Sequence, residues 1–195
     1  MAAARRAAAR RPDLARGLVL LDAPLLSGWK ARAVQIAKAA GIGERLSPAH
    51  VSKRRRQHWP SAQAAFEHFA AKPAFARWAP GVLRDYIACG TEPLADAHEK
   101  GQRLSFDRTV ETAIYNTLPH HLERVLRRHP LQCPMAFIRG TGSEEVRRVG
   151  LSATIRLAQG RVSAIEGSHL FPLERPIDTA AEVLRWIESM HAGPR

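Results

Sequence analysis

The sequence predicts an α/β protein in which a short parallel sheet has flanking helices and an inserted helical cap. Three short apolar runs, residues 17–21, 135–138 and 161–165, have the pattern of strands that are buried on both faces. Each run adjoins a helical pattern rather than a tight hairpin turn, which favours parallel strands joined by helical crossovers. The stretch between the first two runs is far longer than the crossover of about a dozen residues that parallel strands need.

Two amphipathic helices are predicted in the C-terminal part of the chain. Over residues 144–158, apolar side chains recur on one helical face. Ser143 is placed to cap this helix, and Glu144 and Glu145 lie in its first turn, where the macrodipole favours negative charge. A second apolar stripe over residues 179–190 predicts a closing helix.

The stretch from Pro24 to His129 is helical by pattern and is interrupted repeatedly by Pro or Gly. Helices are expected over residues 29–40, 61–71, 81–88 and 109–128. We therefore expect residues 1–23 and 130–195 to form the core, and residues 24–129 to form a separate cap over one end of the sheet. In open α/β sheets ligands bind at the carboxyl ends of strands, so such a cap would wall a pocket. The aromatic residues interpreted as the core of the cap are Trp59, Phe66, Phe69, Phe75 and Trp78.

Length and composition exclude several classes of protein. With 195 residues and an ordinary apolar fraction, the chain is long enough for a real core. It has no apolar run of about 18 residues and no apolar segment of a secretory signal, so we expect a cytoplasmic protein without a membrane span. Its two cysteines, Cys89 and Cys133, are far apart, and no ligand spacing of a known zinc site occurs. We expect no metal and no other cofactor.

The net charge of +12 is the strongest argument for a nucleic-acid or other anionic partner. The basic residues are scattered over the whole chain, however, and the only tight run, from Lys53 to Arg56, has no nucleic-acid motif around it. We interpret the charge as a solvated, Arg-rich surface and expect no nucleic-acid partner. A basic nucleic-acid binder is the rival interpretation, and it would show salt-dependent affinity for DNA or RNA.

The most informative local sequence is EGSHLFPLERP, residues 166–176, directly after the third predicted strand. A glycine releases the strand, His169 lies on the loop at its carboxyl end, and a proline-bounded turn leads into the last helix. This loop resembles the histidine loop of the α/β-hydrolases, G-H-x-x-x-x-E-x-P, with Ser168 inserted between the glycine and the histidine. The resemblance implies that His169 is the general base of a triad, which takes the proton of a serine hydroxyl and returns it to the leaving group.

The other parts of the chain follow the order of the same family. Residues 11–24 resemble the end of the nucleophile helix and the sixth strand, and residues 137–143 resemble the seventh strand and the loop that bears the triad acid. At the place of the acid this chain has Ser143, which cannot hold an imidazolium by charge. Two candidates stay open. Asp22 ends the sixth strand, where haloalkane dehalogenases have their acid, and Glu144 lies one residue beyond the expected place. Asp22 is favoured because a helix's first turn also explains Glu144.

The nucleophile of the family is absent from this sequence. The family's elbow, G-x-S-x-G, exposes a serine on a strained strand-to-helix turn, and no such pentapeptide occurs here. Residues 1–5 resemble the middle of the helix that follows the elbow, so we expect a truncated, C-terminal part of the fold.

The resemblance implies that the full-length parent hydrolyses an ester or similar acyl bond of a small, partly apolar substrate, and that this chain is inactive. The alternative is a non-catalytic remnant that binds a ligand or partner. The short sheet would leave one edge exposed, which predicts self-association or a partner.

Overall fold

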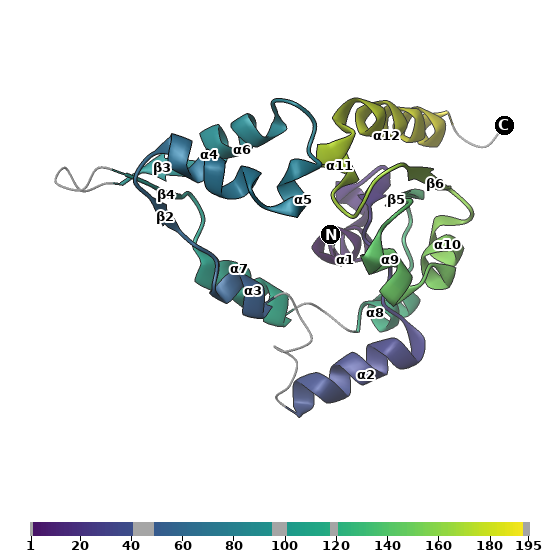
Figure 1. Cartoon of the computed structure of the whole chain (residues 1–195). Coiled ribbons are helices and arrows are strands. Elements are labelled where there is room, and N and C mark those ends of the chain that lie inside the picture. The colour runs from purple at the N-terminus through teal and green to yellow at the C-terminus, as the bar shows by residue number, and fades with distance from the viewer. Residues whose placement is uncertain (1, 41–48, 95–100, 118–120, 193–195) are drawn as a thin grey trace. The chain divides into compact units, whose positions relative to one another are not determined.

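The computed structural model describes residues 2–40, 49–94, 101–117 and 121–192 (Figure 1). The chain divides into two compact units, one formed by Met1–Ala37 and Pro119–Arg195 and the other by Lys38–Leu118. Each unit has its own sheet and its own hydrophobic core. None of the described helices combines the length and the apolar character that crossing a lipid bilayer requires.

The sheet of the first unit has three parallel strands in the order β1-β5-β6. Strand β1 spans Leu18–Leu21, β5 spans Met135–Gly140 and β6 spans Val162–Ile165. β5 lies in the middle, with Phe137 opposite Leu20 of β1 and opposite Val162 of β6. The strands fall on the three predicted apolar runs and are parallel, so the predicted fold class is confirmed.

Helices cover both faces of this sheet. The first unit contains α1 (Ala2–Arg10), η1 (Pro12–Leu14), α8 (Leu122–Arg128), α9 (Glu144–Val149), α10 (Ser152–Ala158), α11 (Phe171–Glu174) and α12 (Pro176–His191). On one face Leu20 and Phe137 pack with Val146 of α9. On the other face Ile138 packs with Phe171 of α11. Successive side chains of β5 therefore enter opposite cores, as the two-residue period of a strand requires.

The single helix predicted over residues 144–158 is wrong, because the structure has two helices there, α9 and α10. Gly150 follows α9 with a φ of 90°, a left-handed conformation that glycine adopts without steric cost and that ends a helix. The prediction that Ser143 caps the N-terminus of this helix is confirmed, since its hydroxyl accepts a hydrogen bond from the Val146 N–H at 3.1 Å. The predicted closing helix is α12.

The second unit is mainly helical. It contains α3 (Ala49–Lys53), α4 (Ala62–Ala70), α5 (Pro73–Ala76), α6 (Val82–Gly90) and α7 (Arg108–Thr117), and α2 (Gly28–Ala39) crosses the boundary in sequence. The helices expected over residues 29–40, 61–71 and 81–88 are α2, α4 and α6. The one expected over residues 109–128 corresponds to α7 and α8, and residues 118–120 between them lie outside the described residues.

The second unit also contains a small antiparallel sheet, which the sequence did not predict. Its strands are β2 (His58–Trp59), β3 (Thr91–Pro93) and β4 (Gln102–Leu104), in the order β2-β4-β3. Strands of two or three residues are too short to show the alternation by which a half-buried strand is recognised. The inserted stretch is therefore not purely helical.

An aromatic cluster forms the core of the second unit. Phe69 is fully buried, and its ring centroid lies 5.4 Å from that of Trp59 and 4.9 Å from that of Phe75. Phe66 packs against the same cluster, and Trp78 lies 4.5 Å from Phe75, ring to ring. The interpretation as a hydrophobic core is confirmed for Trp59 and Phe69, which are buried. Phe66 and Phe75 are partly buried against them, and Trp78 contacts Phe75.

Candidate active site

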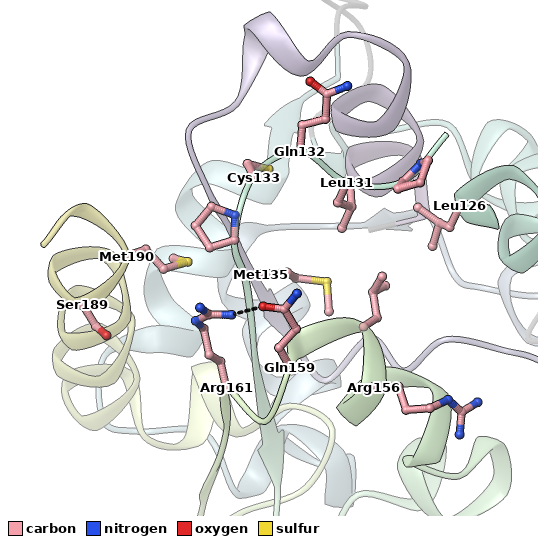
Figure 2. A pocket seen from close by; sticks show the side chains of 13 residues that line it. Leu126, Leu131, Gln132, Cys133, Met135, Arg156, Gln159, Arg161, Ser189 and Met190 are labelled. Carbon is pink, nitrogen blue, oxygen red and sulfur yellow. Dashed lines mark hydrogen bonds between the residues drawn. The ribbon is translucent and has the colours of Figure 1, made fainter. Parts of the chain in front are cut away.

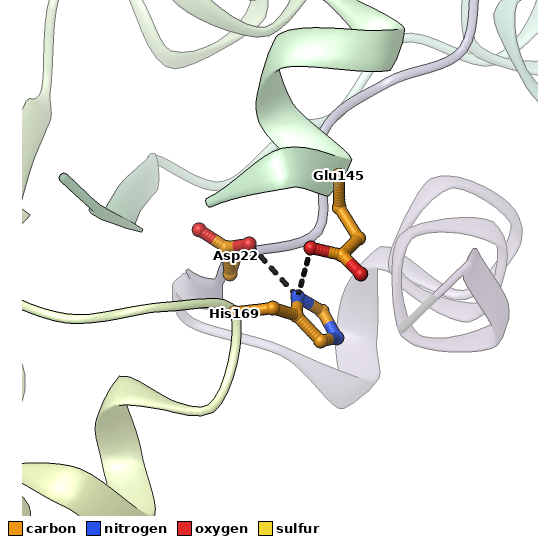
Figure 3. Close-up of side chains that lie close together, drawn as sticks. All are labelled: Asp22, Glu145 and His169. Carbon is orange, nitrogen blue, oxygen red and sulfur yellow. Dashed lines mark hydrogen bonds and ion pairs between the residues drawn. The ribbon is translucent and has the colours of Figure 1, made fainter. Parts of the chain in front are cut away.

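Three polar side chains converge at the carboxyl end of the parallel sheet (Figure 3). Asp22 directly follows β1, His169 lies on the loop after β6, and Glu145 lies in the first turn of α9, which follows β5. Parallel strands end at the same edge of a sheet, so loops that are far apart in sequence meet there. The site is therefore built by all three strands of the first unit.

The closest pair is His169 and Asp22. The imidazole Nδ1 lies 2.8 Å from the carboxylate Oδ2 of Asp22, whose side chain is 1% exposed, whereas that of His169 is 45% exposed. An ionised carboxylate only accepts hydrogen bonds, so Nδ1 carries a proton and donates it. The other ring nitrogen, Nε2, points away from both carboxylates in Figure 3. In this tautomer Nε2 is the proton acceptor.

The Asp22 carboxylate is held by a network of hydrogen bonds. Its Oδ1 accepts from the Gly140 N–H at 2.8 Å, and its Oδ2 accepts from the Ser143 hydroxyl as well as from His169. Burial by itself would raise the pKa of Asp22, but the hydrogen bonds from His169, Ser143 and Gly140 outweigh it and hold the pKa below its usual value. The acid is therefore ionised at neutral pH although it is buried.

The loop that carries His169 is pinned by a close backbone approach and by Glu174. At Gly140, a Cβ would lie 2.2 Å from the Ser168 carbonyl oxygen, so only glycine fits where β5 ends. The Glu174 carboxylate accepts from the Ser168 N–H at 2.9 Å and from its hydroxyl at 2.6 Å. Ser168, the inserted residue of the motif, is thus accommodated by hydrogen bonds to the motif's own glutamate.

A second carboxylate near the imidazole is Glu145, which the sequence did not single out as an acid. Its Oε2 lies 3.9 Å from His169 Nδ1. Glu144, the alternative acid, instead forms an ion pair with Arg147. Glu144 and Glu145 are successive residues in the first turn of α9, so their side chains point in different directions around the helix. No local signal in the sequence says which of the two faces the histidine loop.

The environment of His169 favours its protonated form. The hydrogen bond from Nδ1 to Asp22 raises the pKa of His169, burial opposes this, and the nearby charge of Glu145 raises the pKa further. Asp22, Glu145 and His169 also offer ligand-type atoms within 4.8 Å of one another. The carboxylates of Asp22 and Glu145 both face the same nitrogen, Nδ1 of His169, and the Nδ1–H group donates its hydrogen bond to Asp22. In this structure the three groups are joined through Nδ1, which donates a hydrogen bond to Asp22 and lies near Glu145.

A separate cavity of about 650 Å³ opens at the other end of the sheet, where β5 begins (Figure 2). Leu131, Met135 and Met190 line its apolar part, and Arg161 donates to Gln159 at 3.0 Å on its polar side. Ligands of open α/β sheets bind at the carboxyl ends of the strands, which is the opposite edge. Size alone does not make this cavity the functional site.

Comparisons with known proteins agree with this architecture. No family model and no curated protein matches the chain. Among solved structures, E-2-(acetamidomethylene)succinate hydrolase has a TM-score of 0.67 at 20% sequence identity, over 95% of this chain and 62% of that one. A novel esterase from Mycobacterium tuberculosis has a TM-score of 0.62 at 20% identity, over 96% and 57%. A peroxisomal α/β-hydrolase from Saccharomyces cerevisiae has a TM-score of 0.63 at 14% identity, over 96% and 50%.

The fold is of the α/β-hydrolase type. The similarity extends over nearly all of this chain, whereas the chain spans only 50% to 62% of the length of these three structures. At such identities the likeness concerns the fold, and chemistry has to be argued from the side chains at the site.

Proposed function

We propose that His169 and Asp22 are the general base and the acid of a Ser-His-acid hydrolase that cleaves an ester or similar acyl bond of a small, partly apolar molecule. The observation that carries this proposal is the 2.8 Å contact between Nδ1 and the buried Asp22 carboxylate, with Nε2 directed away from it. This is the arrangement a base needs, because one nitrogen is fixed by the acid and the other takes the proton of the nucleophile.

In the proposed reaction, Nε2 removes the proton of a serine hydroxyl as the oxygen attacks the acyl carbon. Asp22 stabilises the imidazolium that forms, and His169 then returns the proton to the leaving alcohol. The acyl-enzyme is opened by water, which His169 activates in the same way. Asp22 stays ionised throughout, because its three hydrogen-bond donors favour the charged form.

The serine is not part of this proposed half-site, because no G-x-S-x-G elbow occurs in the 195 residues. We propose that the nucleophile and the oxyanion hole belong to a further segment of the parent enzyme. We also propose that residues 24–129, which comprise the second unit and the residues that flank it, form the cap. The 195-residue chain by itself should then hydrolyse no ester. The esterase and hydrolase among the similar structures support an acyl substrate.

The test starts from the coding DNA. An open frame upstream of Met1 that encodes G-x-S-x-G supports the proposal, and the protein expressed from that frame is assayed with p-nitrophenyl esters of increasing acyl length. His169→Ala and Asp22→Asn should each lower kcat by a factor on the order of 10⁴. His191→Ala is the matched control, since that imidazole is exposed near the end of α12 and bonds to the Ile187 carbonyl.

Three results would contradict the proposal. A stop codon directly upstream would make the short chain the product and would favour the alternative, a non-catalytic protein that binds a ligand or partner. Equal activity of the His169→Ala variant and the wild-type enzyme would exclude the histidine as base, whatever the upstream frame encodes. Ester turnover by the 195-residue chain alone would show that the nucleophile lies within it.

A further inference from the structure

The turn after β1 presents Asp22 in an unusual backbone conformation. Asp22 has a φ of 45°, in the left-handed region that non-glycine residues rarely occupy. Its N–H donates to the Ile138 carbonyl at 2.8 Å, which fixes the start of the turn on β5. Farther on, the Leu25 N–H donates to the buried Thr154 hydroxyl at 2.8 Å. Between these two anchors, the direction of the Asp22 side chain depends on how the backbone at residues 22–24 is held.

A buried arginine holds the backbone of this turn between the two hydrogen bonds. Arg5 of α1 is 3% exposed, and its Nη1 donates to the carbonyl oxygen of Ala23 at 2.9 Å. Ala23 is the residue that follows the acid, so this bond joins α1 directly to the turn.

The burial of this guanidinium is poorly compensated. Among the residues that the structure describes, no carboxylate lies within ion-pair distance of Arg5, and its Nε has no hydrogen-bond partner. Desolvation lowers the pKa of Arg5 to about 10. A buried charge that has one neutral acceptor contributes little to folding, and a well-packed apolar side chain of similar length is often as stable. Stability alone therefore does not explain an arginine at this position.

We propose that Arg5 is a positioning residue, whose guanidinium holds the Ala23 carbonyl and so fixes the turn that presents the Asp22 carboxylate to His169. The inference deepens the proposed function and rests on it, because it gives a role to a residue that acts only through the acid. Arg5 itself touches neither the imidazole nor any reacting atom of the proposed mechanism.

The test measures the pKa of His169 by NMR titration of the ring signals in the 195-residue chain, with His169→Ala identifying the signal among the nine histidines. Asp22→Asn should lower this pKa by about 1 unit or more, since the hydrogen bond to the acid is its largest cause. Arg5→Met should lower it by about half a unit or more, with a melting temperature near that of the wild type. In the Asp22→Asn background, Arg5→Met should cause no further change.

The sign of the effect separates positioning from simple electrostatics. Removing a positive charge favours protonation of nearby groups, so the loss of the Arg5 charge alone would raise the pKa of His169, and only a displaced Asp22 lowers it. Glu145, the other charged group that faces the imidazole, is retained in every variant. Arg10→Met is the matched control, because Arg10 is exposed on the same helix and should leave the pKa unchanged.

The outcomes distinguish this inference from the proposed function. If Asp22→Asn leaves the pKa of His169 unchanged, the acid–base pair itself fails. If Asp22→Asn lowers the pKa but Arg5→Met changes only the melting temperature, Arg5 is merely structural and the inference is overturned. Should the methionine variant not fold, Arg5→Lys decides, because it keeps the charge but not the guanidinium geometry. A pKa of His169 in the Arg5→Lys variant that lies between those of the wild type and Asp22→Asn supports positioning. A pKa equal to that of the wild type contradicts it.

Discussion

Replacing Asp22 by Asn should destabilise the first unit by about 2 kcal/mol near pH 5.5, and by less at alkaline pH. The buried carboxylate accepts hydrogen bonds from Gly140, Ser143 and His169. An asparagine oxygen can still accept from the Gly140 N–H, but the amide NH₂ meets two donors. Bonds to a charged acceptor contribute about 1.5–3 kcal/mol each. The net loss of stability is smaller than the contribution of two such bonds, because the Ser143 hydroxyl can rotate and because water reaches the half-exposed imidazole of His169.

The pH dependence follows from the two shifted groups. The pKa of Asp22 is lowered, so its contribution to stability is complete above about pH 4 and is lost as the pH falls through the folded-state pKa. The pKa of His169 is raised, so its contribution is complete below about pH 6.5 and is lost as the pH rises through the folded-state pKa. The pair therefore stabilises the fold most between about pH 4 and pH 6.5.

Urea unfolding followed by circular dichroism at pH 5.5 and pH 8.5 measures this difference. Asp13→Asn is the matched control, because Asp13 is exposed and its ion pair with Arg11 is exposed as well, so the change should alter stability little at either pH. If the free energies of unfolding of Asp22→Asn and the wild type differ by the same amount at both pH values, the coupling between Asp22 and His169 is refuted. An Asp22→Asn variant as stable as the wild type at pH 5.5 would refute the hydrogen-bond argument altogether.

Three further predictions concern the surroundings of the site and the second unit. Gly140→Ala should cost about 2–4 kcal/mol in thermal unfolding, because the added Cβ would lie 2.2 Å from a backbone oxygen of the histidine loop. A loss of stability below about 0.5 kcal/mol would mean that the histidine loop shifts at little cost to accommodate the added Cβ. Glu145→Gln should lower the pKa of His169 in an NMR titration and Glu144→Gln should not, and equal shifts would contradict the geometry. Phe69→Ala should destabilise the second unit by about 3–5 kcal/mol in urea unfolding, because it removes a fully buried ring, and a loss below about 1 kcal/mol would contradict this packing.

The parallel strands and the residues at their carboxyl ends could be predicted from sequence because they depend on strong local signals. A run of apolar residues marked each strand, and the glycine, histidine and proline after β6 marked its loop. The same signals placed Asp22 and His169 at one edge of one sheet. What the local signals could not give was the choice of glutamate. Glu144 and Glu145 are both first-turn residues, and only the three-dimensional direction of α9 separates them.

The errors in the secondary structure have a similar origin. The apolar stripe over residues 144–158 continues in phase across Gly150, so periodicity alone could not reveal that the backbone turns there. The strands β2, β3 and β4 owe their existence to pairing with one another, and a strand of two or three residues carries too little pattern of its own. Both are cases in which tertiary contacts decide what local propensity leaves open.

The position of Asp22 shows that different loops of one parallel sheet can reach the same imidazole. Because all three strands end at one edge, an imidazole on the loop after β6 can be reached both from the loop after β5 and from the turn after β1. Here the turn after β1 supplies Asp22, the last residue of β5 supplies the Gly140 N–H, and the loop after β5 supplies the Ser143 hydroxyl, and both donors orient the carboxylate. Under the proposed function, a serine at the place where the family's acid is expected is therefore compatible with the site, since the buried Asp22 carboxylate on the neighbouring turn requires a hydrogen-bond donor.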